Sequence, residues 1–385
     1  MILQGFLIFK NPQINNPTYR QCIEEAASSL KKCVTACDPN NACFNACHES
    51  FLRTSSNCPC MAKCPAGCPC EDGYNCEPFM TAICEQRSGT YPGGQYKYIL
   101  SPDGHFKENR LYHSPIINDI PYLEKARYGI LNGEVYFFGG TSDNKKIAKL
   151  TDCGIEELSV RLLNNFSSWA RTVTLPTNPD EIMLCSTHAV PYTKCENFDG
   201  QISRNNPFIM NYPHKCGCIA LDNNFPTIID GGDYTAEGPL PILSKVESLG
   251  ISGWREEQDH PLEIRCPACT SVGDGLITIG GQTREEGVDT YLNDAFLFSN
   301  KVWSFAGQIK QRGGLSTLLF YGTHLFNFPG WQGDSVKKVE RISWNGTYVT
   351  GTTIINEETG YCYRPIVFET LPDACADTCE EYCFP

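Results

Sequence analysis

Short apolar runs that end in glycine recur along most of the chain, and each predicts a β-strand. The clearest is EVYFFGG at residues 134–140, and the pattern returns as PTIIDGG ending at Gly232, as GLITIGG ending at Gly281 and, more weakly, as THLFNFPG ending at Gly330. The first glycines of the three pairs, residues 139, 231 and 280, are 92 and 49 residues apart. The longer step is two steps of 46, with the apolar run EIMLCS half-way. The chain therefore repeats one strand-rich unit.

A repeat of roughly 40–50 residues with a glycine-paired strand is typical of the kelch type of β-propeller blade. Strands with Asn, Asp and Gly at their turns make up five such blades between residues 126 and 354. A sixth blade requires the strand at 363–369 to join those at 96–100 and 105–111, which ties both ends of the ring together. The sequence thus predicts a mainly β fold with a six-bladed kelch-like β-propeller over residues 90–371.

The sixth blade of this assignment lacks the strand that corresponds to EVYFFGG, and the N-terminus offers a candidate. Residues 1–10 form an apolar, β-favouring run, followed by a polar linker to residue 21. The run could insert into its own ring, which a tether favours by effective concentration, or into a neighbour's ring, which would build a polymer by strand addition. The side chains that would make either contact are those of Ile2, Leu3, Phe6, Leu7, Ile8 and Phe9.

Residues 22–89 form a predicted cysteine-rich module in two parts. Residues 22–52 contain two helices joined by the turn DPNN, and so short a loop makes them antiparallel. Folding this hairpin pairs Cys33 with Cys47 and Cys37 with Cys43, an arrangement that resembles the α-hairpinin. Residues 58–84 mix cysteine with proline, which predicts an irregular disulfide knot of open connectivity. A metal cluster held by its CxC pairs is the alternative.

The cysteine content indicates the compartment. The chain has 23 cysteines, twelve of them between Cys22 and Cys84, and this density is typical of secreted, disulfide-bonded proteins. The seven histidines do not stand at zinc-finger spacings, which disfavours an intracellular zinc protein. Because 23 is odd, at least one thiol stays free or pairs between chains. Further disulfide candidates are Cys185 with Cys195, and the tail at 372–385 is expected to dock on the cysteine-rich module or a neighbouring subunit.

Charge and chemistry exclude several classes of partner. The net charge is 31 − 44 = −13 without long runs of one sign, which disfavours nucleic acid and anionic lipid as partners. No run approaches the ~20 apolar residues of a membrane span. Asn165 (NFS) and Asn345 (NGT) are glycosylation sequons, which count because secretion is already indicated.

Catalytic motifs are missing from the sequence. It contains no GxSxG, HExxH, Walker or EF-hand pattern, and its histidines form no Tyr-x-x-His or His-x-His set of the kind that a copper oxidase such as galactose oxidase would suggest. We therefore expect a non-enzymatic chain without cofactor or metal.

Several motifs together resemble one group of proteins. They are the run C-x10-C-x3-C-x5-C-x3-C from Cys22, the tract CPC-x3-CPxGCPC after it, and then EVYFFGG, DCGIEEL and IMLC. They are similar to secreted proteins of marine invertebrates, pelagic tunicates among them, in which a cysteine-rich helical segment precedes kelch-like repeats. The resemblance covers residues 22 to about 281 and implies no enzymatic role. One departure is Ala26, where those helices commonly carry cysteine, so Cys22 needs another partner.

Two functions follow as hypotheses. The first is a non-enzymatic extracellular structural protein that assembles with itself, into filaments or a matrix, through the N-terminal strand and the cysteine-rich segments. The alternative is a secreted, monomeric binding module whose propeller recognises a glycan or a protein.

Overall fold

The structure is a computed structural model. The chain divides into two compact units: Met1–Pro78 with Leu371–Pro385, and Phe79–Thr370. The described residues all belong to the second unit and are 79–85, 94–100, 106–111, 126–132, 134–140, 143–151, 154–166, 170–176, 181–185, 193–231, 234–235, 238–239, 243–273, 275–285, 288–321, 324–328, 330, 338–355 and 363–370. These residues form strands and turns, and they include no helix that could cross a membrane. The predicted N-terminal strand, helical hairpin and C-terminal tail lie outside the described residues, as does the predicted knot up to residue 78.

Five four-stranded antiparallel sheets follow one another along the chain, in the order that the repeat predicts. The first has β4 (Arg127–Leu131), β5 (Glu134–Phe138), β6 (Lys146–Thr151) and β7 (Gly154–Arg161); the second has β8 (Arg171–Leu175), β9 (Glu181–Cys185), β10 (Cys195–Phe198) and β11 (Ser203–Asn205). The third has β12 (Cys218–Asp222), β13 (Phe225–Gly231), β16 (Leu243–Gly250) and β17 (Gly253–Glu256); the fourth has β18 (Ala268–Val272), β19 (Gly275–Ile279), β22 (Asp294–Ser299) and β23 (Val302–Gln308); the fifth has β24 (Thr317–Tyr321), β25 (His324–Phe328), β26 (Glu340–Trp344) and β27 (Val349–Ile354). Two hairpins, β14 (Tyr234–Thr235) with β15 (Gly238–Pro239) and β20 (Gln282–Glu285) with β21 (Val288–Tyr291), extend from the third and fourth sheets.

The sixth sheet joins distant parts of the chain and corrects the prediction of a missing strand. It has the order β28 (Tyr363–Thr370), β1 (Phe79–Glu85), β2 (Gly94–Leu100) and β3 (Phe106–Leu111). The place beside the first strand, which β5 takes in the first sheet, belongs to β1, paired from Phe79↔Thr370 to Glu85↔Tyr363. The sheet is therefore complete without residues 1–10, and the sheet unit begins at Phe79 rather than at residue 90. The predicted knot, residues 58–84, takes in most of FMTAICE because Cys84 lies within it, whereas this segment is strand β1.

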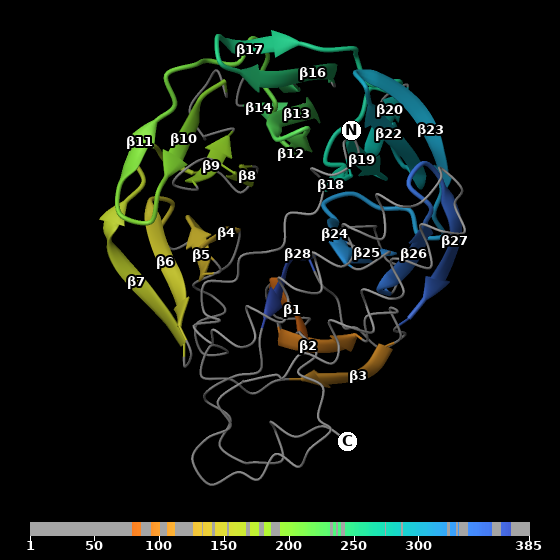
Figure 1. The fold of residues 1–385 in the computed structure, drawn as a ribbon, viewed down its shortest axis with the longest axis horizontal. Helices are drawn as coiled ribbons and strands as arrows, with labels where there is room; N and C mark the ends of the chain where they lie inside the picture. The colour runs from red at the N-terminus through yellow and green to blue at the C-terminus, as the bar shows by residue number, and fades with distance from the viewer. Residues whose placement is uncertain are drawn as a thin grey trace, which may run out of the picture. The chain divides into compact units, whose positions relative to one another are not determined.

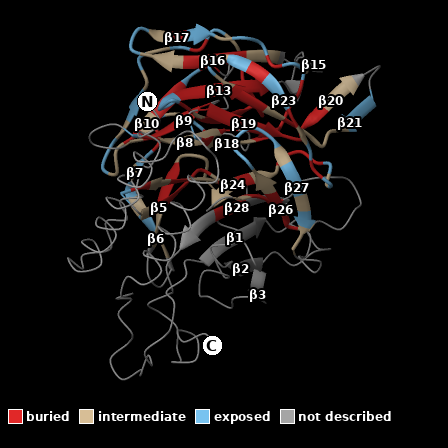
Figure 2. Ribbon diagram, turned by 45° about the vertical axis from the view of Figure 1, so that its right-hand side comes forward, coloured by how far each residue is buried: buried red, intermediate tan, exposed pale blue. Residues whose placement is uncertain are grey.

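The second strand of each repeat is the most deeply buried one, as a strand covered on both faces must be. In β19 all five residues are buried, and in β5, β9 and β25 all but the first. Figure 2 shows this burial running through the middle of the sheets, whereas outer strands such as β17 and β27 carry exposed residues. These strands therefore read as continuous apolar runs in the sequence.

The glycine pairs lie where the chain leaves the second strand in left-handed backbone conformations. Gly139 and Gly140 have φ angles of 67° and 122°, and Gly280 and Gly281 have 66° and 100°. In the third sheet the same two conformations belong to Asp230, at 53°, and Gly231, at 134°. The structural repeat is thus one residue out of step with the pair at 231–232, and its steps are 91 (139 to 230) and 50 (230 to 280). Aspartate can take this place because it tolerates left-handed φ better than most residues.

Hydrophobic clusters join each sheet to the next. Leu131 and Phe198 belong to a cluster between the first and second sheets, and Phe326 and Val367 to one between the fifth and sixth. Another cluster packs Ile366 of β28 against Phe137 of β5, and so joins the sixth sheet to the first. The Tyr128 hydroxyl donates a hydrogen bond to the Val367 carbonyl across the same boundary. Figure 1 shows the six first strands nearest the common centre of these sheets.

Candidate functional site

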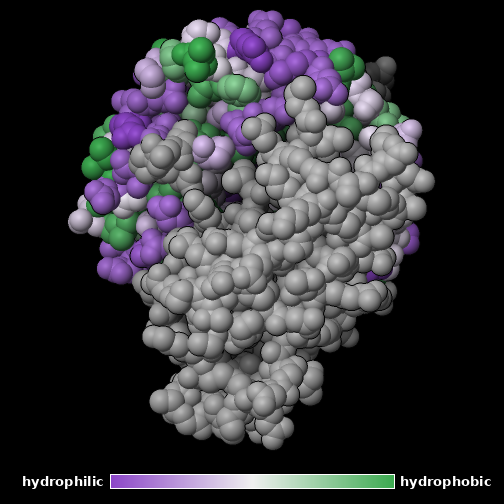
Figure 3. All heavy atoms as spheres, viewed as in Figure 1, coloured by the Kyte–Doolittle hydropathy of each residue, from purple (hydrophilic) through white to green (hydrophobic). Residues whose placement is uncertain are grey.

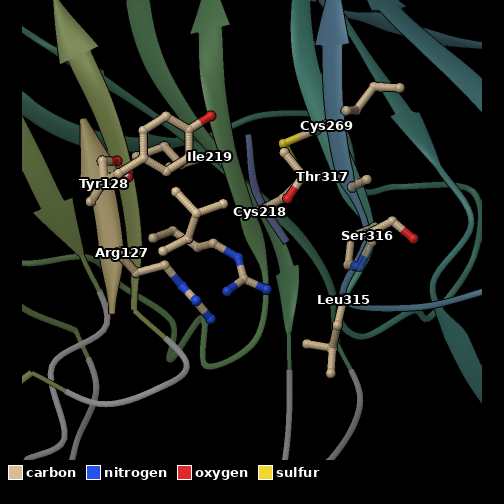
Figure 4. A pocket seen from close by; sticks show the side chains of 14 residues that line it. Arg127, Tyr128, Cys218, Ile219, Cys269, Leu315, Ser316 and Thr317 are labelled. Carbon is tan, nitrogen blue, oxygen red and sulfur yellow. Dashed lines mark hydrogen bonds between the residues drawn. A yellow bond between two sulfur atoms is a disulfide. The ribbon is translucent and has the colours of Figure 1, made fainter. Parts of the chain in front are cut away.

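The first strands of the six sheets surround one cavity. Residues of β4, β8, β12, β18, β24 and β28 or of the segments just before them line it, and its volume is about 150 Å³. Figure 4 shows Arg127 and Tyr128 on the left wall, Leu315, Ser316 and Thr317 on the right, and Cys269 above. Because all six sheets contribute, the cavity exists only when the sheets are assembled.

Two arginines at equivalent places of the repeat line this cavity. Arg127 begins β4 and Arg171 begins β8. Arg127 donates from Nε to the Ala170 carbonyl at 2.8 Å, and Arg171 donates from Nε to the Gly217 carbonyl at 2.6 Å. In both cases the acceptor lies just before the first strand of the next sheet. The bonds orient both guanidinium groups and tie neighbouring sheets together.

The chemistry of the cavity suits a small anion. The described residues that line it include no carboxylate, so the two guanidinium groups are the formal charges in its described wall. A guanidinium presents its N–H donors in a planar fork that matches carboxylate, sulfate and phosphate. About 150 Å³ is below the ~300–1,000 Å³ of pockets for drug-sized ligands, so the cavity suits a smaller ligand. Over the described residues, no three His, Cys, Asp or Glu side chains are placed to hold a metal ion.

Two disulfides connect the third and fourth sheets beside the cavity. Cys216 is bonded to Cys266, and Cys218 to Cys269, with Cα–Cα distances of 4.7 and 5.9 Å. Cys216, Cys218 and Cys266 are buried, whereas Cys269 is half-buried, and both Cys218 and Cys269 line the cavity. Arg171 Nη2 lies 3.9 Å from Cys216 Sγ. The cavity thus combines two cations with a disulfide in its wall.

Buried glutamates on the third strands hold the segments that lead into the sheets. Glu247 of β16 accepts hydrogen bonds from the backbone N–H groups of Asn211 and Tyr212 at 2.9 and 3.0 Å, and Glu340 of β26 accepts those of Lys310 and Gln311. Glu196 of β10 does the same for two consecutive residues. All three glutamates are fully buried. Each one satisfies backbone donors that a connecting segment would otherwise bury unpaired.

Asp230 is the unusual buried acid of the described part. Its side chain is fully buried, and neither carboxyl oxygen has a hydrogen-bond partner. Burial raises its pKa well above the usual value, and the charge of Asp259 adds to the rise. His260 Nδ1 lies 3.7 Å from Asp230 Oδ2, but burial lowers the pKa of His260 to about 4, so the imidazole is neutral at pH 7 and supplies no counter-charge.

The residues predicted from the sequence lie away from the cavity. Cys185 and Cys195 are disulfide-bonded, with a Cα–Cα distance of 4.1 Å, between β9 and β10. Asn165 and Asn345 are exposed. Cys33, Cys37, Cys43 and Cys47, like Ile2, Leu3, Phe6, Leu7, Ile8 and Phe9, lie outside the described residues.

Exposed apolar residues of the described part are dispersed. Ile251, Val288 and Tyr348 belong to three different turns or hairpins. In Figure 3 the hydrophobic residues of the described surface are interspersed with hydrophilic ones. This surface therefore points to no particular docking partner.

The cavity residues were missed from the sequence, although a signal for them is present. The paired cysteines are 50 and 51 residues apart, which is one structural repeat, and Arg127 and Arg171 are 44 apart. Residues at one place of successive repeats become neighbours across the first strands. A search for chemically related residues at the repeat distance would have found both sets.

Comparison with known proteins supports the fold alone. No protein-family model and no curated protein matches the sequence. Solved structures do match, and one of them is described as "Structure of YjhT". It is 15% identical, with a TM-score of 0.52, over 72% of this chain and 97% of that one. The chain thus shares its mainly β architecture of antiparallel four-stranded sheets with solved structures.

Proposed function

We propose that this chain is an extracellular, disulfide-stabilised binding protein whose six sheets close into a kelch-like β-propeller and whose central cavity binds a small oxyanion-bearing ligand. Six inter-sheet clusters and the Tyr128–Val367 hydrogen bond support ring closure. The three disulfides between described residues support an oxidising compartment. The observation that carries the ligand is the pair of guanidinium groups, Arg127 and Arg171, in a small cavity without a described carboxylate.

Replacing Arg171 with Gln is expected to weaken binding of sulfate, phosphate or a small carboxylate by roughly 10–100-fold, because a hydrogen bond to a charged group contributes about 1.5–3 kcal/mol. Titration calorimetry with each anion measures the change. Arg127→Lys keeps a positive charge but loses the planar fork of N–H donors, so it should weaken anion binding less than Arg171→Gln does. Arg255, an exposed arginine outside the cavity lining, gives the matched control Arg255→Gln with unchanged binding. Equal binding by Arg171→Gln and wild type, or binding of neutral sugars alone, would contradict the proposal.

Asn345 offers a test of secretion. It lies in the exposed turn between β26 and β27, where its Oδ1 accepts hydrogen bonds from the backbone N–H groups of Thr347 and Tyr348 at 3.0 and 2.8 Å. Its amide nitrogen is therefore the atom left to carry a glycan. Expression through a eukaryotic secretory pathway should yield a chain whose mass falls after glycosidase treatment and in Asn345→Gln. The control Asn300→Gln, an exposed asparagine outside a sequon, should change nothing, and an Asn345→Gln chain of unaltered glycan mass would refute the prediction.

Self-assembly stays a prediction without support from a described residue. One of its three motivations, a vacant strand position in the sixth sheet, is removed because β1 occupies that position. The other two, the apolar N-terminal segment and the odd number of cysteines, are not tested by the described residues. We therefore place the binding function first.

A further inference from the structure

The two disulfides between the third and fourth sheets differ in access. Cys216 is 0% exposed and Cys266 5%, so a solvent thiol cannot reach their sulfurs without opening the sheets. Cys269, by contrast, is half-buried and faces the cavity with Cys218. One disulfide is thus shielded and the other forms part of the cavity wall.

The charges of the same cavity select what can reach that disulfide. Arg127 and Arg171 line the wall with it, and Arg171 Nη2 lies 3.9 Å from the sulfur of the neighbouring Cys216. A thiolate is the attacking species in thiol–disulfide exchange, and nearby cations stabilise both the attacking and the leaving thiolate. A small thiol that also carries a carboxylate would be attracted to these arginines both through its thiolate and through its carboxylate.

We propose that Cys218–Cys269 is a thiol–disulfide exchange site for small anionic thiols. The inference rests on the oxyanion-binding cavity proposed above and names the ligand class. The thiolate attacks Cys269 Sγ, the Cys269–Cys218 bond breaks, and Cys218 leaves with the electron pair and takes a proton from solvent. A second thiolate attacks the mixed disulfide and releases Cys269. The net result is one small-molecule disulfide formed from two thiols, and one protein disulfide reduced to two thiols.

The shielded disulfide, Cys216–Cys266, keeps the third and fourth sheets joined during exchange at Cys218–Cys269. While Cys218–Cys269 is open, Cys216–Cys266 still holds β12 and β18 together, and the Leu315 N–H still donates to the Cys266 carbonyl at 2.9 Å. Exchange therefore alters the cavity wall without separating the sheets.

The test treats the full chain with mercaptoacetate, 2-mercaptoethanol or cysteamine at equal thiolate concentration and follows each cysteine by differential alkylation and mass spectrometry. Cys218 and Cys269 should be alkylated first, and mercaptoacetate should react roughly fivefold or more faster than the neutral thiol, with cysteamine slowest. The buried pair Cys185–Cys195 is the internal reference. Arg171→Gln should lower the charge preference, because Arg127 then supplies the positive charge of the described wall alone, and Arg255→Gln should leave it unchanged.

Three outcomes overturn the exchange site: reduction of Cys216–Cys266 at the same rate as Cys218–Cys269, a charge preference in Arg171→Gln equal to that of wild type, or no charge preference in wild type at all. Sulfate binding, measured by calorimetry on the same proteins, separates the two proposals. If sulfate binds in an Arg171-dependent manner but the thiols show no charge preference, the binding function stands and the exchange site falls. If sulfate does not bind, the proposed oxyanion-binding function fails, whatever the result of the thiol experiment.

Discussion

Glu247→Ala is expected to lower the free energy of unfolding by about 3–5 kcal/mol, the cost of removing one partner of a buried charged network. Glu247 is fully buried and accepts hydrogen bonds from the backbone and side-chain N–H groups of Asn211, from the Tyr212 N–H and from His214 Nε2 at 2.9 Å. The substitution leaves these donors without their acceptor in a site that excludes water. Chemical denaturation measures the change.

The matched control is Glu263→Ala, at an exposed glutamate five residues before β18, which should change the free energy of unfolding by less than about 0.5 kcal/mol. Burial raises the pKa of Glu247, but the hydrogen bonds from His214, Asn211 and Tyr212 outweigh it and hold the pKa below its usual range. This stabilisation is therefore present at neutral pH and is lost as the pH falls below about 4, toward the folded-state pKa. Equal losses of unfolding free energy in Glu247→Ala and Glu263→Ala would contradict a stabilising role for the hydrogen bonds of Glu247.

Asp230→Gly is expected to raise the free energy of unfolding by about 1–3 kcal/mol, because it removes a buried carboxyl group that has no hydrogen-bond partner. Glycine occupies the equivalent place at Gly139 and Gly280, with φ angles near that of Asp230. The extra freedom of glycine in the unfolded chain costs roughly 0.5–1 kcal/mol, and relief of the left-handed conformation offsets it. The His214 contact survives, because its Nδ1 lies 2.8 Å from the backbone carbonyl of Asp230.

The dependence on pH distinguishes the cause of this gain. The raised pKa means that folded Asp230 holds its proton more tightly than the unfolded chain, so its contribution declines as pH rises above about 4. The advantage of Asp230→Gly over wild type should therefore grow as the pH rises above about 4, the usual pKa of an aspartate in an unfolded chain. Asp230→Asn, which keeps the shape and cannot ionise, should share the pH trend but not the full gain. A variant less stable than wild type at every pH would mean that the carboxyl has a partner that stabilises the fold.

Local pattern was enough to predict most strands but not the closing sheet. A buried strand flanked by glycine is recognisable because apolar burial on both faces and left-handed turns require particular residues. FMTAICE carries the same apolar character, but its partner β28 lies nearly three hundred residues away, at 363–370. No local signal says which of two apolar segments, residues 1–10 or β1, takes the place between β28 and β2.

The cavity shows the same division. The residues alone are enough to show a strand-rich, repeated chain whose chemistry is dominated by cysteine. That Arg127, Arg171, Cys218 and Cys269 line one cavity is set by the assembled sheets, because it depends on which strand of each repeat lies innermost and on which sheets are neighbours. The fold likewise puts Asp230 in a glycine's place. Hydrophobic periodicity acts within a strand, whereas the contacts between sheets form only when distant strands pack together.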